Sequence, residues 1–147
     1  MPAAIAYART GSGPPLVLVH GITESRHSWD PLIPSLAERF DVVAVDLRGH
    51  GESAKVNGIW ELVIDGPVAE LDAFTDAVLD GVTVPYLSLH GIDPGPPYVE
   101  WLTACCPTAT VEVWPDDSHY PHLADPERFL ARVAEFTGHS RTSATPD

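Results

Sequence analysis

The strongest constraint on the fold of this chain is a set of short, continuous apolar runs that alternate with stretches of helical periodicity. Residues 16–19 and 42–45 contain no polar side chain. Runs of this kind are typical of strands that are buried on both faces of a parallel sheet. We therefore expect an α/β fold, with a mostly parallel sheet and helices on both of its faces.

Further elements continue the alternation along the chain. Asp30-Pro31 and Asp125-Pro126 each place an N-cap residue before a proline suited to the first helical position. The first of these helices carries its apolar face on Leu32, Ile33, Leu36 and Phe40, and the last one is closed by Gly138. The pattern also predicts strands over 84–89 and 110–114 and helices over 67–79 and 98–106. We expect residues 1–136 to form a single compact domain and residues 137–147 to form a flexible tail.

Composition and charge narrow the range of partners. The net charge of −13 would repel nucleic acid and anionic membranes, so we expect neither as a partner. No apolar run reaches the length of a membrane span, and the first residues lack the features of a signal peptide. The adjacent Cys105 and Cys106 do not suggest a disulfide framework and are typical of the packed end of a helix. We therefore expect a cytoplasmic protein that acts on a small molecule.

Polar residues of catalytic type follow each of the predicted strands. Ligand sites of open α/β sheets form at the carboxyl ends of the strands. The segments that follow the strands are His20-Gly21, 46–53, 90–93 and 116–119. Because these segments come after parallel strands, we expect them to meet at one edge of the sheet.

Two parts of the chain resemble the α/β-hydrolase superfamily, in the branch that holds small esterases, cofactor-free haloperoxidases and epoxide hydrolases. The first part combines Pro15-Leu-Val-Leu-Val-His-Gly with Asp46-Leu-Arg-Gly-His-Gly-Glu-Ser. The second combines Pro85-Tyr-Leu-Ser-Leu-His-Gly-Ile-Asp with the segment Ser118-His-Tyr-Pro-His that precedes the final helix. The resemblance implies a backbone N–H of Ile22 in an oxyanion hole, His119 as general base and Asp93 as its acidic partner.

One part of the family pattern is missing. The family places its nucleophile in Gly-x-Ser-x-Gly, and no serine here has glycine two residues away on both sides. Only residues 54–83 lie between the two matching parts, which is too few for the strands and helices that the family has there. The resemblance therefore implies a truncated α/β-hydrolase fold, with an internal deletion and no separate lid domain. We expect the strand edges left open to pair directly, 16–19 with 86–89, or to be closed by a homodimer.

The nucleophile stays unknown at this point. Several side chains are candidates, but each lacks an evident base beside it or is expected to be buried. They are Ser25, Ser28, Ser53, Ser88, Ser118, Cys105 and Cys106.

For the other polar residues we prefer a structural role within their own turns and loops. The histidines His20, His50 and His90 belong to His-Gly turns, where hydrogen bonds to loops are expected. Asp46 and Arg48 are expected to make structural hydrogen bonds. A metal site formed by His119, His122 and Asp116 is a remote alternative, so we expect neither a metal nor a cofactor. The tryptophans Trp29, Trp60, Trp101 and Trp114 are expected to pack in the core and at its rim.

The sequence favours a hydrolase of small esters or related acyl substrates that uses His119 as general base. Two alternatives stay open, because fold alone does not decide function. The chain could be a non-catalytic remnant that serves as a binding or assembly module. It could also be an enzyme that needs no serine and uses a dyad of His119 and Asp93 to move protons.

Overall fold

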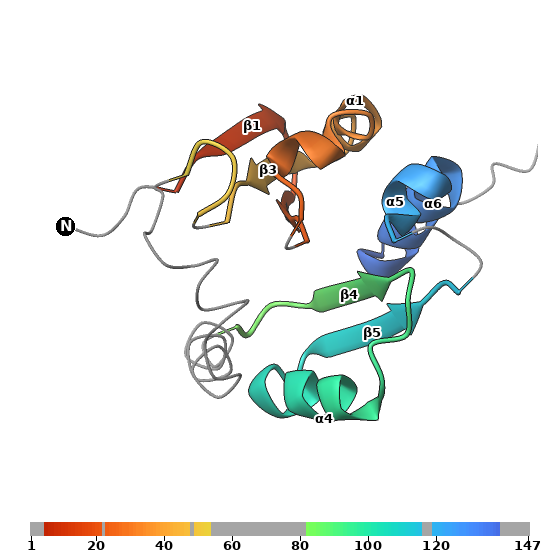
Figure 1. Cartoon of the computed structure of the whole chain (residues 1–147). Helices are drawn as coiled ribbons and strands as arrows, with labels where there is room; N and C mark the ends of the chain where they lie inside the picture. The colour runs from red at the N-terminus through yellow and green to blue at the C-terminus, as the bar shows by residue number, and fades with distance from the viewer. Residues whose placement is uncertain (1–4, 22, 48, 54–81, 116–118, 139–147) are drawn as a thin grey trace, which may run out of the picture. The chain divides into compact units, whose positions relative to one another are not determined.

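The computed structural model describes residues 5–21, 23–47, 49–53, 82–115 and 119–138 (Figure 1). The chain divides into two compact units, Met1–Gly66 and Pro67–Asp147, and each is described by itself. The helix expected over 67–79, the stretch 54–66 and most of the expected tail lie outside the described residues. No helix among the described residues is long and apolar enough to cross a membrane.

The first unit contains a three-stranded sheet with the order β1-β3-β2. The predicted strands are present as β2 (Pro15–Val19) and β3 (Asp41–Val45), which pair in parallel. An additional strand, β1 (Tyr7–Gly11), pairs antiparallel to β3. Sequence analysis missed β1 because all five of its residues are exposed, so the strand has no buried apolar set for a pattern to reveal.

Two short helices cover this sheet, and the predicted start of the helix after Asp30 is wrong. A 3-10 helix, η1 (Arg26–Trp29), comes first and ends at Asp30. The α-helix, α1 (Ile33–Ala37), begins after Leu32, which makes no side-chain cap. The carboxylate of Asp30 instead lies 2.9 Å from Nδ1 of His27, which explains why it does not cap α1. The predicted apolar face is correct in its main members, since Leu32, Leu36 and Phe40 are buried.

The core of the first unit lies on one face of its sheet. Leu18, Val42 and Ala44 are buried on the face that α1 covers. The alternate residues point to the opposite face. There Val17 is 59% exposed and Val19 is 44% exposed. The expectation that β2 is buried on both faces is therefore wrong for the described part of this unit.

The second unit is a two-stranded parallel sheet between helices. Its elements are β4 (Tyr86–His90), α4 (Pro96–Cys105), β5 (Ala109–Val113), α5 (Pro121–Ala124) and α6 (Pro126–Phe136). Tyr98 of α4 approaches Ser88 on one face of the sheet. Arg132 of α6 binds Glu112 on the other face. Helices therefore cover both faces of this sheet, as predicted (Figure 1).

The ends of the helices follow the sequence signals closely in the second unit. The side chain of Asp125 accepts a hydrogen bond from the backbone N–H of Arg128 (3.0 Å), so Asp125 is the predicted N-cap of α6. Gly138 follows α6 with a φ of 71°, a conformation that favours glycine. Helix α4 ends at Cys105, and the next residue, Cys106, is fully buried as a free thiol.

A buried carboxylate organises the loops of the first unit. Asp46 follows β3 and is 0% exposed. It accepts hydrogen bonds from the backbone N–H groups of Arg26 (2.7 Å) and Glu52 (2.9 Å), and it pairs with the Arg26 guanidinium. Burial alone would raise the pKa of Asp46, but these two N–H groups and the charge of Arg26 hold it below its usual value. The expected structural role of Asp46 is therefore confirmed, while Arg48 lies outside the described residues.

Gly51 gives a test of this arrangement, because its φ is 49° and a Cβ at this position would overlap the Asp46 carboxylate. We expect Gly51→Ala to lower the free energy of unfolding by more than the ~1–2 kcal/mol that a left-handed backbone costs an alanine. The matched control is Gly138→Ala, since Gly138 also has a positive φ but has nothing within 4 Å of the added carbon. Urea denaturation measures both changes, and equal losses would contradict the steric argument.

Among the described strands, β2 and β4 each have a partner strand on one side only within their own sheets. Direct pairing of 16–19 with 86–89 would join the two units, and it stays a prediction, as does closure of these edges by a second copy of the chain. Sedimentation velocity tests the second possibility: we expect a dimer, and a monodisperse monomer would contradict closure by a second copy.

Candidate active site

The carboxyl ends of β4 and β5 bring three titratable residues of the second unit into one neighbourhood. His90 is the last residue of β4, Asp93 lies in the following loop, and His119 follows β5. The pKa of His90 responds to the charges of both Asp93 and His119. Asp93 and His119 therefore both lie within electrostatic range of His90, at the end of the sheet where the parallel strands led us to expect them.

Asp93 and His119 are both exposed but are not in direct contact. Asp93 accepts a hydrogen bond from the backbone N–H of Gly95 (2.8 Å), which turns the chain into α4. The ring of His119 meets the ring of Tyr120 edge-on, with 5.2 Å between centroids. In the described part of the chain, no hydrogen bond or ion pair joins Asp93 to His119. The catalytic roles of these two residues stay predictions.

His90 makes the closest polar contacts of this neighbourhood. Its Nε2 lies 2.8 Å from the hydroxyl of Ser88, two residues earlier on the same face of β4. Tyr98, in the first turn of α4, places its ring edge-on to His90 and its hydroxyl 3.5 Å from that of Ser88. Sequence analysis gave His90 a local role and placed Ser88 in the interior. The pattern that reveals the pair is simply a serine and a histidine two apart in a strand.

The electrostatic surroundings favour the neutral form of His90. Burial lowers the pKa of His90, and the charge of His119 lowers it further. The negative charge of Asp93 acts in the opposite direction, but the pKa stays below the usual value of 6.5. At neutral pH His90 is therefore mainly uncharged, with one ring nitrogen able to accept a proton.

The predicted oxyanion donor, Ile22, lies outside the described residues, but its neighbours in the first unit are described. His20 is buried, and its Nε2 accepts a hydrogen bond from the backbone N–H of Leu47 (3.0 Å). Its Nδ1 lies 2.7 Å from the carbonyl oxygen of Gly21 and donates to it, because the other nitrogen is the acceptor. His20 thus joins the end of β2 to the loop after β3, which is the local role expected for it.

Another candidate nucleophile, Ser53, has a structural role. The Ser53 hydroxyl donates to the carbonyl oxygen of Asp46 (2.6 Å) and accepts from the N–H of Ala6 (2.8 Å). Asp116 and Ser118 lie outside the described residues, and the described ones contain no group of three His, Cys, Asp or Glu side chains suited to a metal ion. Trp29 and Trp114 are buried, as expected.

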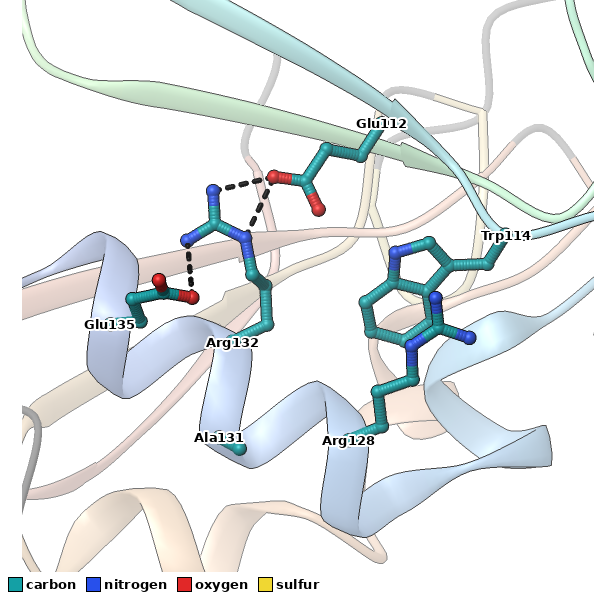
Figure 2. Close-up of a pocket in the computed structure, with 6 residues that line it drawn as sticks. All are labelled: Glu112, Trp114, Arg128, Ala131, Arg132 and Glu135. Carbon is teal, nitrogen blue, oxygen red and sulfur yellow. Dashed lines mark hydrogen bonds and ion pairs between the residues drawn. The ribbon is translucent and has the colours of Figure 1, made fainter.

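A shallow pocket of about 310 Å³ lies between β5 and α6 and does not include the histidines (Figure 2). Figure 2 shows Arg132 between two carboxylates: its Nε lies 2.7 Å from Glu112, and its Nη1 lies 3.6 Å from Glu135. The Arg128 guanidinium stacks over the ring of Trp114 at 3.8 Å. Because the charge of Arg132 is balanced by these acids, we interpret the pocket as part of the packing of α6 on the sheet.

A parallel sheet with helices on both faces, and histidines with a carboxylate after its carboxyl ends, places this chain among the α/β proteins. The family model described as "alpha/beta hydrolase fold" matches residues 14–94. The chain therefore belongs to the α/β-hydrolase family.

Known proteins resemble parts of the chain. A soluble epoxide hydrolase of Corynebacterium sp. is 55% identical over 49 residues, which are 33% of this chain and 17% of that protein. A pimeloyl-[acyl-carrier protein] methyl ester esterase of Nitrosomonas europaea is 36% identical over 78 residues, 53% of this chain and 27% of that protein. The matches thus span less than a third of either relative's length.

The fold also resembles that of solved structures. The esterase RhEst1 from Rhodococcus sp. ECU1013 superposes with a TM-score of 0.63 at 18% identity, over 92% of this chain and 95% of that one. At this identity the similarity concerns the fold alone. It nevertheless confirms the predicted fold class along most of the chain.

The electrostatic interaction of Asp93 with His90 can be tested by titration of the His90 ring. We expect Asp93→Asn to lower the pKa of His90 further, because the substitution removes the negative charge that raises it. Two-dimensional NMR of the histidine rings as a function of pH measures this shift. Glu100→Gln is the control, because Glu100 is exposed on α4 and is not among the groups that shift His90. An unchanged pKa in Asp93→Asn would place Asp93 away from His90.

Proposed function

We propose that this chain hydrolyses small esters or related acyl compounds and that His119 acts as a general base. The observation that carries the proposal is that the parallel pairing of β4 with β5 brings the exposed His119 to the same end of the sheet as His90 and Asp93. Proton transfer in acyl chemistry needs groups of this type close together, with one of them open to substrate and water. His119 is exposed, so water and a small ester can both reach its ring.

Membership in the α/β-hydrolase family supports an acyl substrate. One relative with a matching segment is named as a methyl ester esterase, and a protein of the same fold is named as an esterase. Both names contain the word esterase, and we propose an ester as the substrate of this chain on that basis. The absence of a direct Asp93–His119 bond argues against a dyad that works without further groups.

Hydrolysis of p-nitrophenyl acetate tests the proposal. We expect the native chain to release p-nitrophenol faster than buffer does, and His119→Ala to lower kcat/KM by about 10²–10⁴-fold, the usual contribution of a general base. The control is His27→Ala, which removes an exposed histidine whose Nδ1 is paired with Asp30 in the first unit.

The two variants separate the outcomes. A loss confined to His119→Ala supports the proposal. Equal rates for all three proteins would remove His119 from the reaction, and a native chain no faster than buffer would favour a binding or assembly module.

A further inference from the structure

We propose that Ser88 is the nucleophile of this chain and that His90 accepts its proton. The inference rests on the proposed ester hydrolysis. It supplies a nucleophile for a chain that lacks the Gly-x-Ser-x-Gly motif of the family. Its basis is the 2.8 Å separation between Ser88 Oγ and His90 Nε2. Among the serines in the described ranges, Ser88 alone hydrogen-bonds a histidine. A nucleophile with a base in hydrogen-bond reach is the arrangement that activates a hydroxyl.

A second buried serine shows what a structural hydroxyl in this chain does instead. Ser53 donates to a backbone carbonyl and accepts from a backbone N–H, and so it joins two segments of the main chain. The contacts of Ser88 are both to side chains, the imidazole of His90 and the hydroxyl of Tyr98. The Ser88 hydroxyl is therefore bonded to side chains and not to the main chain.

The backbone of β4 fixes the pair. Side chains two apart in a strand project from the same face, so Ser88 and His90 lie side by side without any strained turn. The β4 backbone is in turn held by β5, through the parallel register that sets Ser88 opposite Val111. Helix α4 covers this face, and its Tyr98 contacts both members of the pair.

The chemical steps balance as ordinary acyl transfer. Ser88 Oγ forms a bond to the ester carbonyl carbon while its proton passes to His90 Nε2. The ester C–O bond then breaks, and the alcohol leaves with that proton. The Tyr98 hydroxyl, 3.5 Å from Ser88 Oγ, supplies a hydrogen bond to the carbonyl oxygen while it carries negative charge.

Water then attacks the acyl carbon of the acylated Ser88, and one of its protons passes to the exposed His119. The bond from the acyl carbon to Oγ breaks, the acid is released, and the proton that His119 took up returns to Ser88 Oγ, so both histidines end the cycle uncharged. The two histidines thus serve different half-reactions, in keeping with their different exposure.

Burial of the Ser88 hydroxyl limits the size of the acyl group that can reach it. Ser88 is 7% exposed, so an acyl chain must enter beside His90 and Tyr98 to reach it. We therefore expect acetyl esters, which have the smallest acyl chain apart from formyl, to react faster at this site than esters with longer acyl chains.

Covalent labelling of the native chain with methanesulfonyl fluoride, a reagent of about the size of an acetyl group, tests the inference. Attack of Ser88 Oγ on sulfur expels fluoride, and we expect peptide mapping by mass spectrometry to find the adduct on Ser88. Ser88→Ala should lose the adduct and at least about 100-fold in p-nitrophenyl acetate hydrolysis, since proton transfer is lost with the nucleophile. Ser35→Ala is the control, because Ser35 is an exposed serine of α1.

The outcomes distinguish this inference from the proposed function. An adduct on another serine, or no adduct on a chain that still hydrolyses ester with the help of His119, overturns Ser88 and leaves the proposed function in place. An adduct on Ser88 in a chain that releases no p-nitrophenol upholds the nucleophile and overturns the esterase proposal. Mapping of the native chain gives these answers even where Ser88→Ala does not fold.

Discussion

The parallel pairing of β4 with β5 is the constraint on which the chemistry of the second unit depends. Its register places His90 opposite Val113, so the segments that follow the two strands leave the sheet at the same edge. Asp93 and His119 are 26 positions apart in the sequence, yet both act on the pKa of His90 because of this pairing. Helices α4 and α6 cover opposite faces and leave that edge for the loops.

In the first unit, the buried carboxylate of Asp46 holds the loops that follow the parallel strands. Two parallel strands end at Val19 and Val45, and the chain after each must turn without a further strand to hold it. Asp46 binds backbone N–H groups from both of the loops that need support, and Arg26 offsets its charge. A buried acid with fewer donors would be protonated or would destabilise the fold. The crowding around Gly51 follows from this arrangement, since the loop passes directly over the carboxylate.

Sequence alone predicted the elements whose signals are local. The apolar runs of β2, β3 and β4 and the cap at Asp125 were found because burial and capping leave a direct mark on the residues. The strand β1 was missed because its five residues are exposed, and the start of α1 was misplaced because Asp30 binds His27 instead of a helix N–H. At the site, strand order predicted that Asp93 and His119 would approach each other. It did not predict the contact of Tyr98 with Ser88, which depends on how α4 packs.

A serine in a regular strand differs physically from one at a strained turn, and the difference bears on how such a site would work. A tight turn exposes the hydroxyl, whereas β4 keeps Ser88 in the interior and surrounds it with His90 and Tyr98. The strand compensates by fixing the distance between hydroxyl and imidazole through backbone geometry, so little conformational entropy is lost when the proton moves. Low exposure of Ser88 also limits the water around its hydroxyl, which strengthens the hydrogen bond to His90 and slows the entry of substrate. If Ser88 is the nucleophile we propose, preorganisation and access therefore oppose each other, and the balance would favour small acyl groups.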